Sequence, residues 1–134
     1  MTEKINKILI KETRKAFKNN EIPVAAVVVK NNKIISKAHN VRQKCFDVTG
    51  HAEVKAIIKA AKKQKDWRLD EYELYVTLEP CAMCRKIIEE ARIKKVYYMK
   101  SSGSKKQNAK VSYEQIFCLE ECDKMFESFF KKLR

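Results

Sequence analysis

An expected strand runs into an expected helix in the stretch Leu74-Tyr75-Val76-Thr77-Leu78-Glu79-Pro80-Cys81-Ala82-Met83-Cys84. Apolar and polar side chains alternate from Glu73 to Thr77, which is the period of a strand with two different faces. Pro80 suits the first turn of a helix, where its missing N–H is not needed, so we expect a helix from Cys81 to Arg92. A strand followed by a helix is the repeating unit of a sheet with helical crossovers.

Upstream of this stretch, the sequence predicts a helix and a hairpin. The apolar residues between Glu3 and Phe17 recur at helical spacing, with Lys and Glu on the other face. An apolar run from Val24 to Val29 and a second strand from Lys33 to Ala38 flank Asn31-Asn32. Because Asn tolerates positive φ, this pair favours a tight turn, and the two strands should form a hairpin.

The remaining segments complete an alternation of helices and strands. We expect a helix from His51 to Lys62, strands from Lys95 to Met99 and from Val111 to Phe117, and a last helix from Leu119 to Leu133. The segment Lys100 to Lys110 is rich in Ser, Lys and Gln and is typical of a solvated connection. Strands that alternate with helices need crossovers, so the sequence predicts an α/β fold whose sheet is covered on both faces.

The bulk composition fits a single globular domain. The chain has 134 residues, of which 45% are hydrophobic, and we treat residues 1–134 as one domain with one core. No apolar run approaches the roughly 20 residues that a membrane span needs, and the N-terminus lacks the apolar segment of a signal peptide. We therefore expect a cytoplasmic protein with no membrane partner.

The cysteines and the charge add two constraints. The chain has 5 cysteines, and Cys45, Cys118 and Cys122 form no disulfide framework, which favours a reducing compartment. The net charge of +13 attracts polyanions, nucleic acid above all. A Lys-rich genome composition explains the same excess equally well, so charge alone does not establish a nucleic-acid partner.

Two short motifs supply a set of metal ligands. One is His51-Ala52-Glu53 and the other contains Cys81 and Cys84, and each opens an expected helix. Zinc binds imidazole and thiolate, and a catalytic zinc site has three protein ligands and one open position for water. One His and two Cys satisfy this pattern. The start of a helix is also expected to lower the pKa of a cysteine thiol, which favours the ligating thiolate.

Glu53 is the candidate proton carrier of this site. It lies two residues after His51 at the first turn of the expected helix, where a carboxylate can reach a water molecule beside the metal. Two other interpretations stay open for the cysteines. A redox pair would not call for His51, and a structural zinc site would need a fourth ligand, for which His39, Cys118 and Cys122 are candidates without ligand spacing.

The order H-A-E followed by P-C-x-x-C is the signature of the zinc-dependent nucleobase deaminases, and this chain resembles that family. Within the family it is most similar to the bacterial tRNA-specific adenosine deaminases, which convert the wobble adenosine of an arginine tRNA to inosine. The similar strings are Ile22-Pro23-Val24, Ala38-His39-Asn40, Thr49-Gly50-His51-Ala52-Glu53, Leu74 to Cys84, Ala91-Arg92-Ile93, Glu121-Cys122 and Ser128-Phe129-Phe130.

The resemblance implies a role for each matching residue. One Zn²⁺ per chain would be held by His51, Cys81 and Cys84, with Glu53 as the catalytic proton shuttle. Asn40 matches an Asn that hydrogen-bonds the substrate nucleoside, although a turn residue is an equally good explanation for it. Val24 and Ala52 match positions that line the base pocket. The family fold is a cytidine deaminase-like three-layer α/β/α sandwich with a mixed five-stranded sheet, and the family acts as a homodimer on the tRNA anticodon loop.

The sequence departs from the family after the strand Lys95 to Met99. The resemblance implies an Arg-Asp pair and a longer segment there, and this chain has Lys100-Ser101-Ser102-Gly103-Ser104 instead. The tRNA substrate therefore has alternatives: a free base, nucleoside or nucleotide such as guanine, cytosine or deoxycytidylate. A non-catalytic, zinc-stabilised RNA-binding protein is a third hypothesis, against which the presence of Glu53 argues.

The C-terminal helix is a candidate surface for RNA. Phe126 and Phe129 belong to its apolar stripe, whereas Phe130 lies about a hundred degrees around the helix from Phe129. We expect Phe130 to stack on an unpaired base. Phosphates would be neutralised by Lys131, Lys132 and Arg134.

Overall fold

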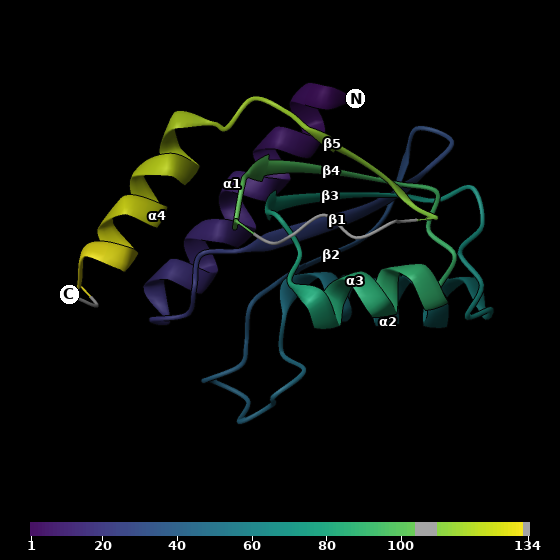
Figure 1. Cartoon of the computed structure of the whole chain (residues 1–134), viewed down its shortest axis with the longest axis horizontal. Coiled ribbons are helices and arrows are strands. Elements are labelled where there is room, and N and C mark those ends of the chain that lie inside the picture. The colour runs from purple at the N-terminus through teal and green to yellow at the C-terminus, as the bar shows by residue number, and fades with distance from the viewer. Residues whose placement is uncertain (104–109, 133–134) are drawn as a thin grey trace.

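The computed structural model describes residues 1–103 and 110–132. Its helices and strands alternate in the predicted order (Figure 1). The expected helix and hairpin at the N-terminus are present, and so are all later elements. The elements are α1 (Thr2–Lys18), β1 (Ala25–Lys30), β2 (Lys33–His39), α2 (Ala52–Gln64), β3 (Glu73–Leu78), α3 (Ala82–Glu90), β4 (Lys95–Lys100), β5 (Ser112–Gln115) and α4 (Glu120–Lys132).

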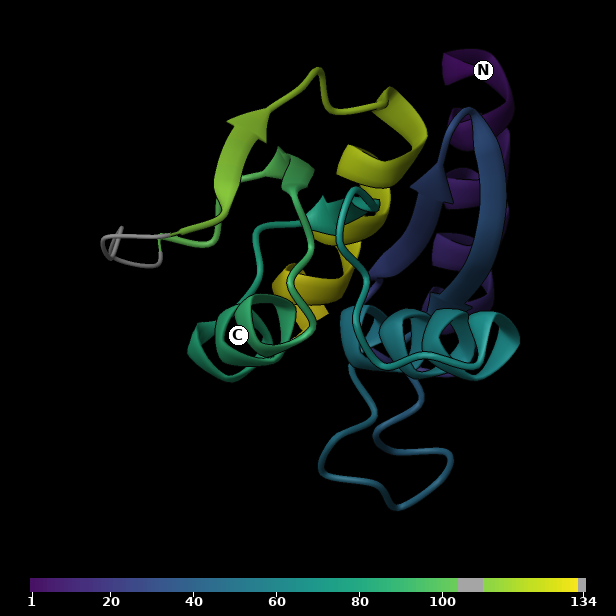
Figure 2. The same ribbon diagram turned by 90° about the vertical axis from the view of Figure 1, so that its right-hand side faces the viewer.

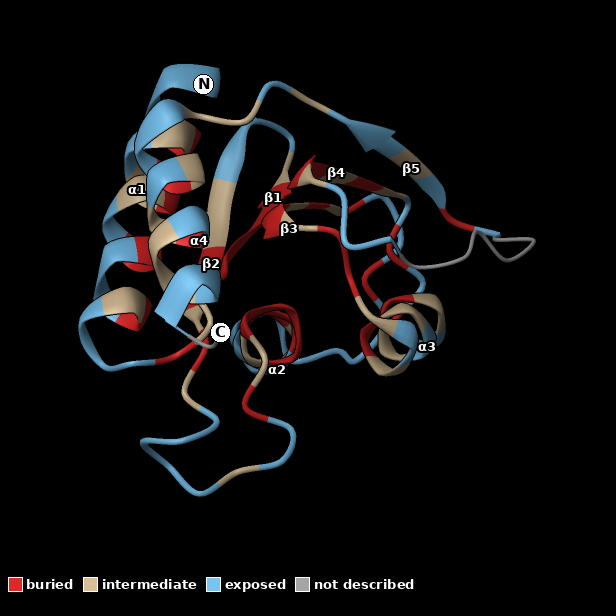
Figure 3. Ribbon diagram, turned by 60° about the vertical axis from the view of Figure 1, so that its left-hand side comes forward, coloured by how far each residue is buried: buried red, intermediate tan, exposed pale blue. Residues whose placement is uncertain are grey.

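The five strands form one mixed sheet in the order β2-β1-β3-β4-β5. Strand β1 is antiparallel to both β2 and β3, whereas β3, β4 and β5 are parallel to one another. Helices α1 and α4 lie on one side of the sheet and α2 and α3 on the other (Figures 2 and 3). The predicted fold class, a three-layer α/β/α sandwich with a mixed five-stranded sheet, is confirmed.

The core lies on both faces of the central strands. The five residues from Ala25 to Val29 are all buried, as expected for a strand covered by helices on both sides. Phe126 of α4 and Leu9 of α1 are fully buried on one face, and Ala56 of α2 and Ile88 of α3 on the other. Among the described residues, no helix has the length and apolar character needed to cross a lipid bilayer.

The turn between β1 and β2 is the one that Asn31-Asn32 predicts. Asn31 has φ 49° and Asn32 has φ 60°, so both central residues adopt the positive φ of a tight hairpin turn. Lys30 pairs with Lys33 at the end of the ladder. A bulge between Val28 and Val29 shifts the register in the middle of the hairpin.

Two elements are shorter than expected. Helix α3 ends at Glu90 rather than Arg92, because Arg92 adopts a left-handed conformation with φ 64° that terminates the helix. The last strand covers Ser112–Gln115 rather than the range 111–117, since its ladder with β4 ends at Gln115. Residues 104–109 of the expected connection, and Leu133 and Arg134 at the C-terminus, lie outside the described residues.

The topology brings several strand ends to one edge of the sheet. Ala25 at the start of β1 pairs with His39 at the end of β2. Leu78 at the end of β3 pairs with Lys100 at the end of β4. Asn40, Glu79 and Ser101, which follow these strand ends, therefore lie at the same edge, together with the loops that lead to α2 and α3.

Candidate active site

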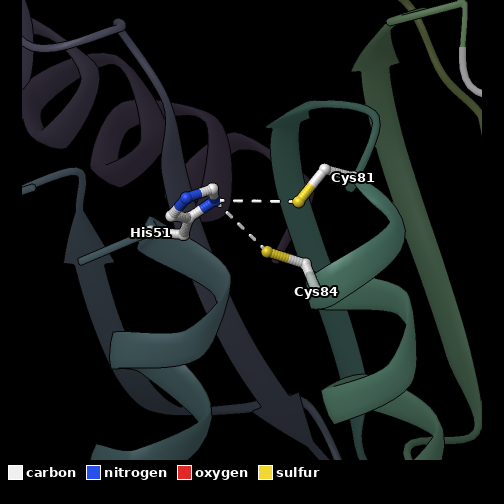
Figure 4. A group of neighbouring side chains, drawn as sticks. All are labelled: His51, Cys81 and Cys84. Carbon is white, nitrogen blue, oxygen red and sulfur yellow. Dashed lines mark hydrogen bonds between the residues drawn. The ribbon is translucent and has the colours of Figure 1, made fainter. Parts of the chain in front are cut away.

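His51, Cys81 and Cys84 converge at this edge of the sheet (Figure 4). The His51 Nδ1 atom lies 3.8 Å from the Cys81 Sγ atom and 3.5 Å from the Cys84 Sγ atom. Tetrahedral zinc, with Zn–N near 2.0 Å and Zn–S near 2.3 Å, places a nitrogen and a sulfur ligand about 3.5 Å apart. The spacing and the chemistry of these three side chains therefore fit a single Zn²⁺ ion.

The local backbone explains why the three ligands face one another. His51 and Cys81 are the N-cap residues of α2 and α3, and both have extended backbone conformations. Cys84 lies three residues after Cys81, one turn into α3, so both sulfur atoms lie on the same side of the helix (Figure 4). Two helix starts that meet at the edge of the sheet thus supply the complete ligand set.

No fourth ligand joins this group among residues 1–103 and 110–132. His39, one of the candidates for a fourth ligand, instead contacts the Glu12 carboxylate of α1 at 3.0 Å. Cys118 and Cys122 are also outside the group, and all five cysteines are free thiols. Three protein ligands leave one position open, which is the arrangement of a catalytic rather than a structural zinc site.

Burial governs the protonation of the ligands. Burial, together with the positive charge of Arg42, lowers the pKa of His51 and favours the neutral imidazole that binds metal. Burial raises the pKa of the Cys84 thiol, and the neighbouring Glu53 and Cys81 side chains raise it further. The expectation that the helix start lowers this pKa is therefore wrong for Cys84, and its thiolate depends on the charge of a bound cation.

Glu53 lies beside the ligand set and is shielded from solvent. Glu53 is only 4% exposed, and its side chain contacts that of Cys84. Burial raises the pKa of the Glu53 carboxyl, although a backbone hydrogen bond and the contact with Cys84 oppose the increase. A buried carboxyl with a raised pKa takes up a proton more readily than an exposed one, which suits a group that carries protons.

Asn40 connects the end of β2 to the start of α2. Its Oδ1 atom accepts a hydrogen bond from the backbone N–H of Ala52 at 2.8 Å. This contact satisfies one of the N–H groups that a helix start leaves without an intrahelical partner. The carbonyl side of the amide is thus used by the fold, and its NH₂ group is the part that can donate to a ligand.

A pocket of about 300 Å³ opens over the ligand set, near the small end of the size range of ligand sites. Val24 and Asn40 line it, as the resemblance implies, but Ala52 does not. The Ala52 side chain is fully buried in the core. Phe130 lies in a separate hollow of about 370 Å³ on α4, beside Lys100 and Lys131. The pocket is lined by Ile22, Val24, Asn40, His51, Glu53, Leu78, Glu79, Cys81 and Ser102.

Sequence reasoning did not assign two polar residues of this pocket, Glu79 and Ser102. The Glu79 carboxylate is buried and accepts hydrogen bonds from the backbone N–H of Ser102 at 3.0 Å and from the Arg85 Nη2 atom at 2.7 Å. Because Glu79 directly precedes Pro80 and Cys81, its position in the sequence could have marked it as a residue of the site. No comparable signal marked Ser102, because it lies in the segment after β4 that departs from the family.

Comparison with known proteins gives consistent results at the level of sequence and of structure. The sequence model of the cytidine and deoxycytidylate deaminase zinc-binding region matches residues 1–100. A curated relative, the tRNA-specific adenosine deaminase of Aquifex aeolicus, is 39% identical over 142 residues, covering 96% of this chain and 93% of the relative.

Two similar solved structures come from deaminases that are named for different substrates. One comes from work on A-to-I editing by tRNA:A34 deaminases at the wobble position. It has a TM-score of 0.77 and 31% identity, and covers 82% of this chain and 95% of its own. The other is guanine deaminase from Bacillus subtilis, with a TM-score of 0.67 and 27% identity, covering 94% of this chain and 93% of its own.

Proposed function

This chain belongs to the cytidine and deoxycytidylate deaminase family, and from that membership we propose that it is a zinc-dependent hydrolase that converts adenosine to inosine at the wobble position of tRNA. One observation carries the proposal. The buried Glu53 carboxyl lies beside the three-ligand group of His51, Cys81 and Cys84, at a pocket of about 300 Å³. A non-catalytic zinc-stabilised protein has no use for this combination.

The reaction replaces the exocyclic amine of adenine with oxygen from water and releases ammonia. When bound by His51, Cys81 and Cys84, zinc supplies a Lewis acid that lowers the pKa of a water molecule in its open position. The Glu53 carboxylate would take up one proton of the attacking water and deliver it to the ring nitrogen. It would then carry the second proton of that water to the amine, which leaves as ammonia. The Glu53 carboxyl is itself shielded from bulk water, since the residue is only 4% exposed.

Asn40 and Val24 orient the base over the ligand set. The Asn40 Oδ1 atom is held by the Ala52 N–H, so the direction of its NH₂ group is set by the start of α2. Val24 is buried and lies at the apolar side of the pocket with Ile22 and Leu78. An apolar wall with one oriented polar group is the usual composition of a site for a flat heterocycle.

Several observations support tRNA as the substrate rather than a free base. Three curated relatives, each aligned with 93% or more of the chain, are tRNA-specific adenosine deaminases. The net charge of +13 favours a polyanionic partner. The hollow at Phe130, with Lys100 and Lys131, lies at the end of β4 and offers an aromatic ring and two cations to an unpaired nucleotide. We further infer that the protein acts in the cytoplasm as a homodimer, as the family resemblance implies.

A substrate panel tests the proposal. The zinc-loaded protein is incubated at equal concentration with an arginine tRNA stem-loop bearing a wobble adenosine, with free adenosine, with guanine and with deoxycytidylate. We expect inosine in the stem-loop at a rate well above that for free adenosine. Turnover of guanine or deoxycytidylate with an unmodified stem-loop would refute the proposal that RNA is the substrate. It would still be consistent with zinc-dependent deamination.

A further inference from the structure

The segment between β2 and α2, residues 41–50, projects from the body of the protein as a loop (Figures 1 and 2). Its tip is apolar and exposed to solvent. Phe46 is 96% exposed and Val48 is 70% exposed. A partner that covered these two neighbouring apolar side chains would gain the free energy of burying them.

The first half of this loop is held by a buried carboxylate. Glu21, which is 2% exposed, accepts hydrogen bonds from the backbone N–H of Gln43 at 3.0 Å and from that of Lys44 at 2.8 Å. The loop is also closed at its base, because the Val41 N–H donates to the Gly50 carbonyl at 2.9 Å. A charged acceptor makes these among the stronger hydrogen bonds that a backbone can form.

The second half is held by Asp47. Its carboxylate accepts hydrogen bonds from the Lys55 ammonium at 2.7 Å and from the Thr49 hydroxyl at 2.7 Å. Gly50 then passes close to the backbone of Arg42, where an added Cβ would lie 2.7 Å from the Arg42 nitrogen. Only glycine permits this approach, so the shape of the loop is specified by the chain itself rather than by a ligand.

Phe46 has a backbone conformation that its side chain disfavours. Its φ is 50°, in the left-handed region that non-glycine residues rarely adopt, and that bulky residues adopt least of all. Such strain persists where the surrounding structure imposes it, and it is concentrated at ligand-binding segments. The folded loop therefore bears the free-energy cost of a disfavoured backbone conformation at a residue whose aromatic ring is exposed to solvent.

The loop adjoins the pocket at both of its ends. The loop starts directly after Asn40 and ends at His51, and both residues line the pocket. Arg42 and Lys44 are exposed on the same loop. From this arrangement, and resting on the proposed function, we propose that Phe46 stacks on an unpaired base of the RNA strand next to the target adenosine, while Arg42 and Lys44 contact the adjoining phosphates.

The chemistry of the loop favours nucleic acid over a protein partner. An exposed aromatic ring near cationic side chains is the arrangement that binds single-stranded nucleic acid, because every base offers a face for stacking. Arg42 and Lys44 lie four and two residues before Phe46 and complement phosphate, so we expect this loop to lie outside the contact of the homodimer inferred above. The favoured partner is thus a polyanion with unstacked bases.

The test compares RNA and nucleoside substrates in matched variants. Phe46→Ala removes the ring, Phe46→Asn removes it with a residue that tolerates positive φ, and Phe46→Tyr keeps a stacking face. Val48→Ala is the control for apolar exposure in the same loop. We expect both ring-deleting variants to raise KM for the stem-loop about 5- to 100-fold, as stacking losses do, with kcat and free-adenosine turnover unchanged. Phe46→Tyr should restore the wild-type KM.

A fluorescent base analogue, 2-aminopurine, placed beside the target in the stem-loop provides an independent readout. Wild-type protein should quench it by stacking, and Phe46→Ala should not. Equal KM and equal quenching in all variants, while wild-type protein still deaminates the stem-loop, would refute the role of Phe46 alone. Failure of wild-type protein to deaminate any stem-loop would instead refute the proposed function. A loss of dimer in sedimentation of Phe46→Ala, without loss of quenching, would assign the loop to protein contact and overturn the proposal.

Discussion

The Arg85 guanidinium donates a hydrogen bond to the Glu79 carboxylate at 2.7 Å, and both side chains are largely buried. Glu79 directly follows β3, so the pair joins this segment to α3, which carries Cys84. Glu79 accepts further hydrogen bonds from the Ser101 hydroxyl at 3.1 Å and the Ser102 N–H at 3.0 Å, and Arg85 lies over the Tyr113 ring of β5. The ion pair, the hydrogen bonds that Glu79 accepts and the contact of Arg85 with Tyr113 together fix one wall of the pocket.

Replacing Arg85 with Ala should destabilise the protein and disturb the pocket. Removing one partner of a buried ion pair leaves the other charge without compensation and costs about 3 kcal/mol of the free energy of unfolding. We expect urea denaturation to show this loss, and KM for the stem-loop to rise because Glu79, which holds Ser101 and Ser102, loses the guanidinium that positions it. Arg85→Lys keeps the charge but lacks the planar fork, so it should recover only part of the stability.

Metal analysis should find one zinc ion per chain. Chelation should lower both activity and thermal stability, because metal binding is coupled to folding. Cys81→Ala removes one ligand of the set and should lose the metal, whereas Cys45→Ala, in the exposed loop, should retain it and serves as the control. Full activity of protein shown to be free of zinc would contradict the assignment of the metal.

Glu53→Ala should keep the zinc and the fold but lose turnover. Glu53 is assigned to proton transfer and is not part of the ligand group, so we expect kcat to fall on the order of 100- to 10,000-fold with unchanged zinc content. Single-turnover kinetics and metal analysis on the same preparation check both halves. A variant that lost zinc, or that kept a near-normal rate, would place Glu53 elsewhere in the site.

Stability should decrease at acid pH through Glu12. Burial raises the pKa of this carboxyl, but hydrogen bonds from His39 and Lys15 outweigh the burial and lower it below the ordinary 4.5. A carboxyl with a lowered pKa stabilises the folded state above about pH 4.5, and this contribution is lost as pH falls through the lowered pKa. Glu12→Gln should lose about 1 to 3 kcal/mol at neutral pH and show a flatter decline in acid.

The control for this comparison is Glu3→Gln, on the same helix. The Glu3 side chain is 86% exposed and forms only a loose contact with Lys7 at 3.8 Å. Its removal should leave the acid limb of the stability curve unchanged. Chemical denaturation between pH 3 and pH 7 measures both variants, and identical curves for the two would rule out the assigned role of Glu12.

Removing the cations at the end of α4 should weaken RNA binding. Lys131 lines the hollow at Phe130, and Lys132 lies over the Phe17 ring at 5.6 Å. Each phosphate contact that is lost should reduce the slope of log affinity against log salt by about 0.7 to 0.9. We therefore expect the variant that combines Lys131→Ala and Lys132→Ala to bind RNA more weakly at low salt and with a flatter salt dependence. Lys4→Ala with Lys11→Ala, two exposed lysines of α1, is the charge-matched control.

Residue type and spacing were sufficient to predict the order of helices and strands and the three side chains whose arrangement fits a metal ion. The spacing of apolar residues over about ten positions is enough to distinguish a helix from a strand. The positive φ of Asn31 follows from its short polar side chain. His51, Cys81 and Cys84 were identified because zinc selects imidazole and thiolate, and because a ligand pair three residues apart on a helix faces one way. These are local properties, so the sequence determines them without reference to packing.

Tertiary structure alone decided what surrounds each side chain. Ala52 is buried in the core, and Glu79 meets Ser102, a residue 23 positions away, because the sheet order places the ends of β3 and β4 side by side. The loop that exposes Phe46 is shaped by Glu21, which is distant in sequence. Burial, pKa and hydrogen-bond partners are set by neighbours from other elements, and no local period in the sequence encodes which neighbours those are.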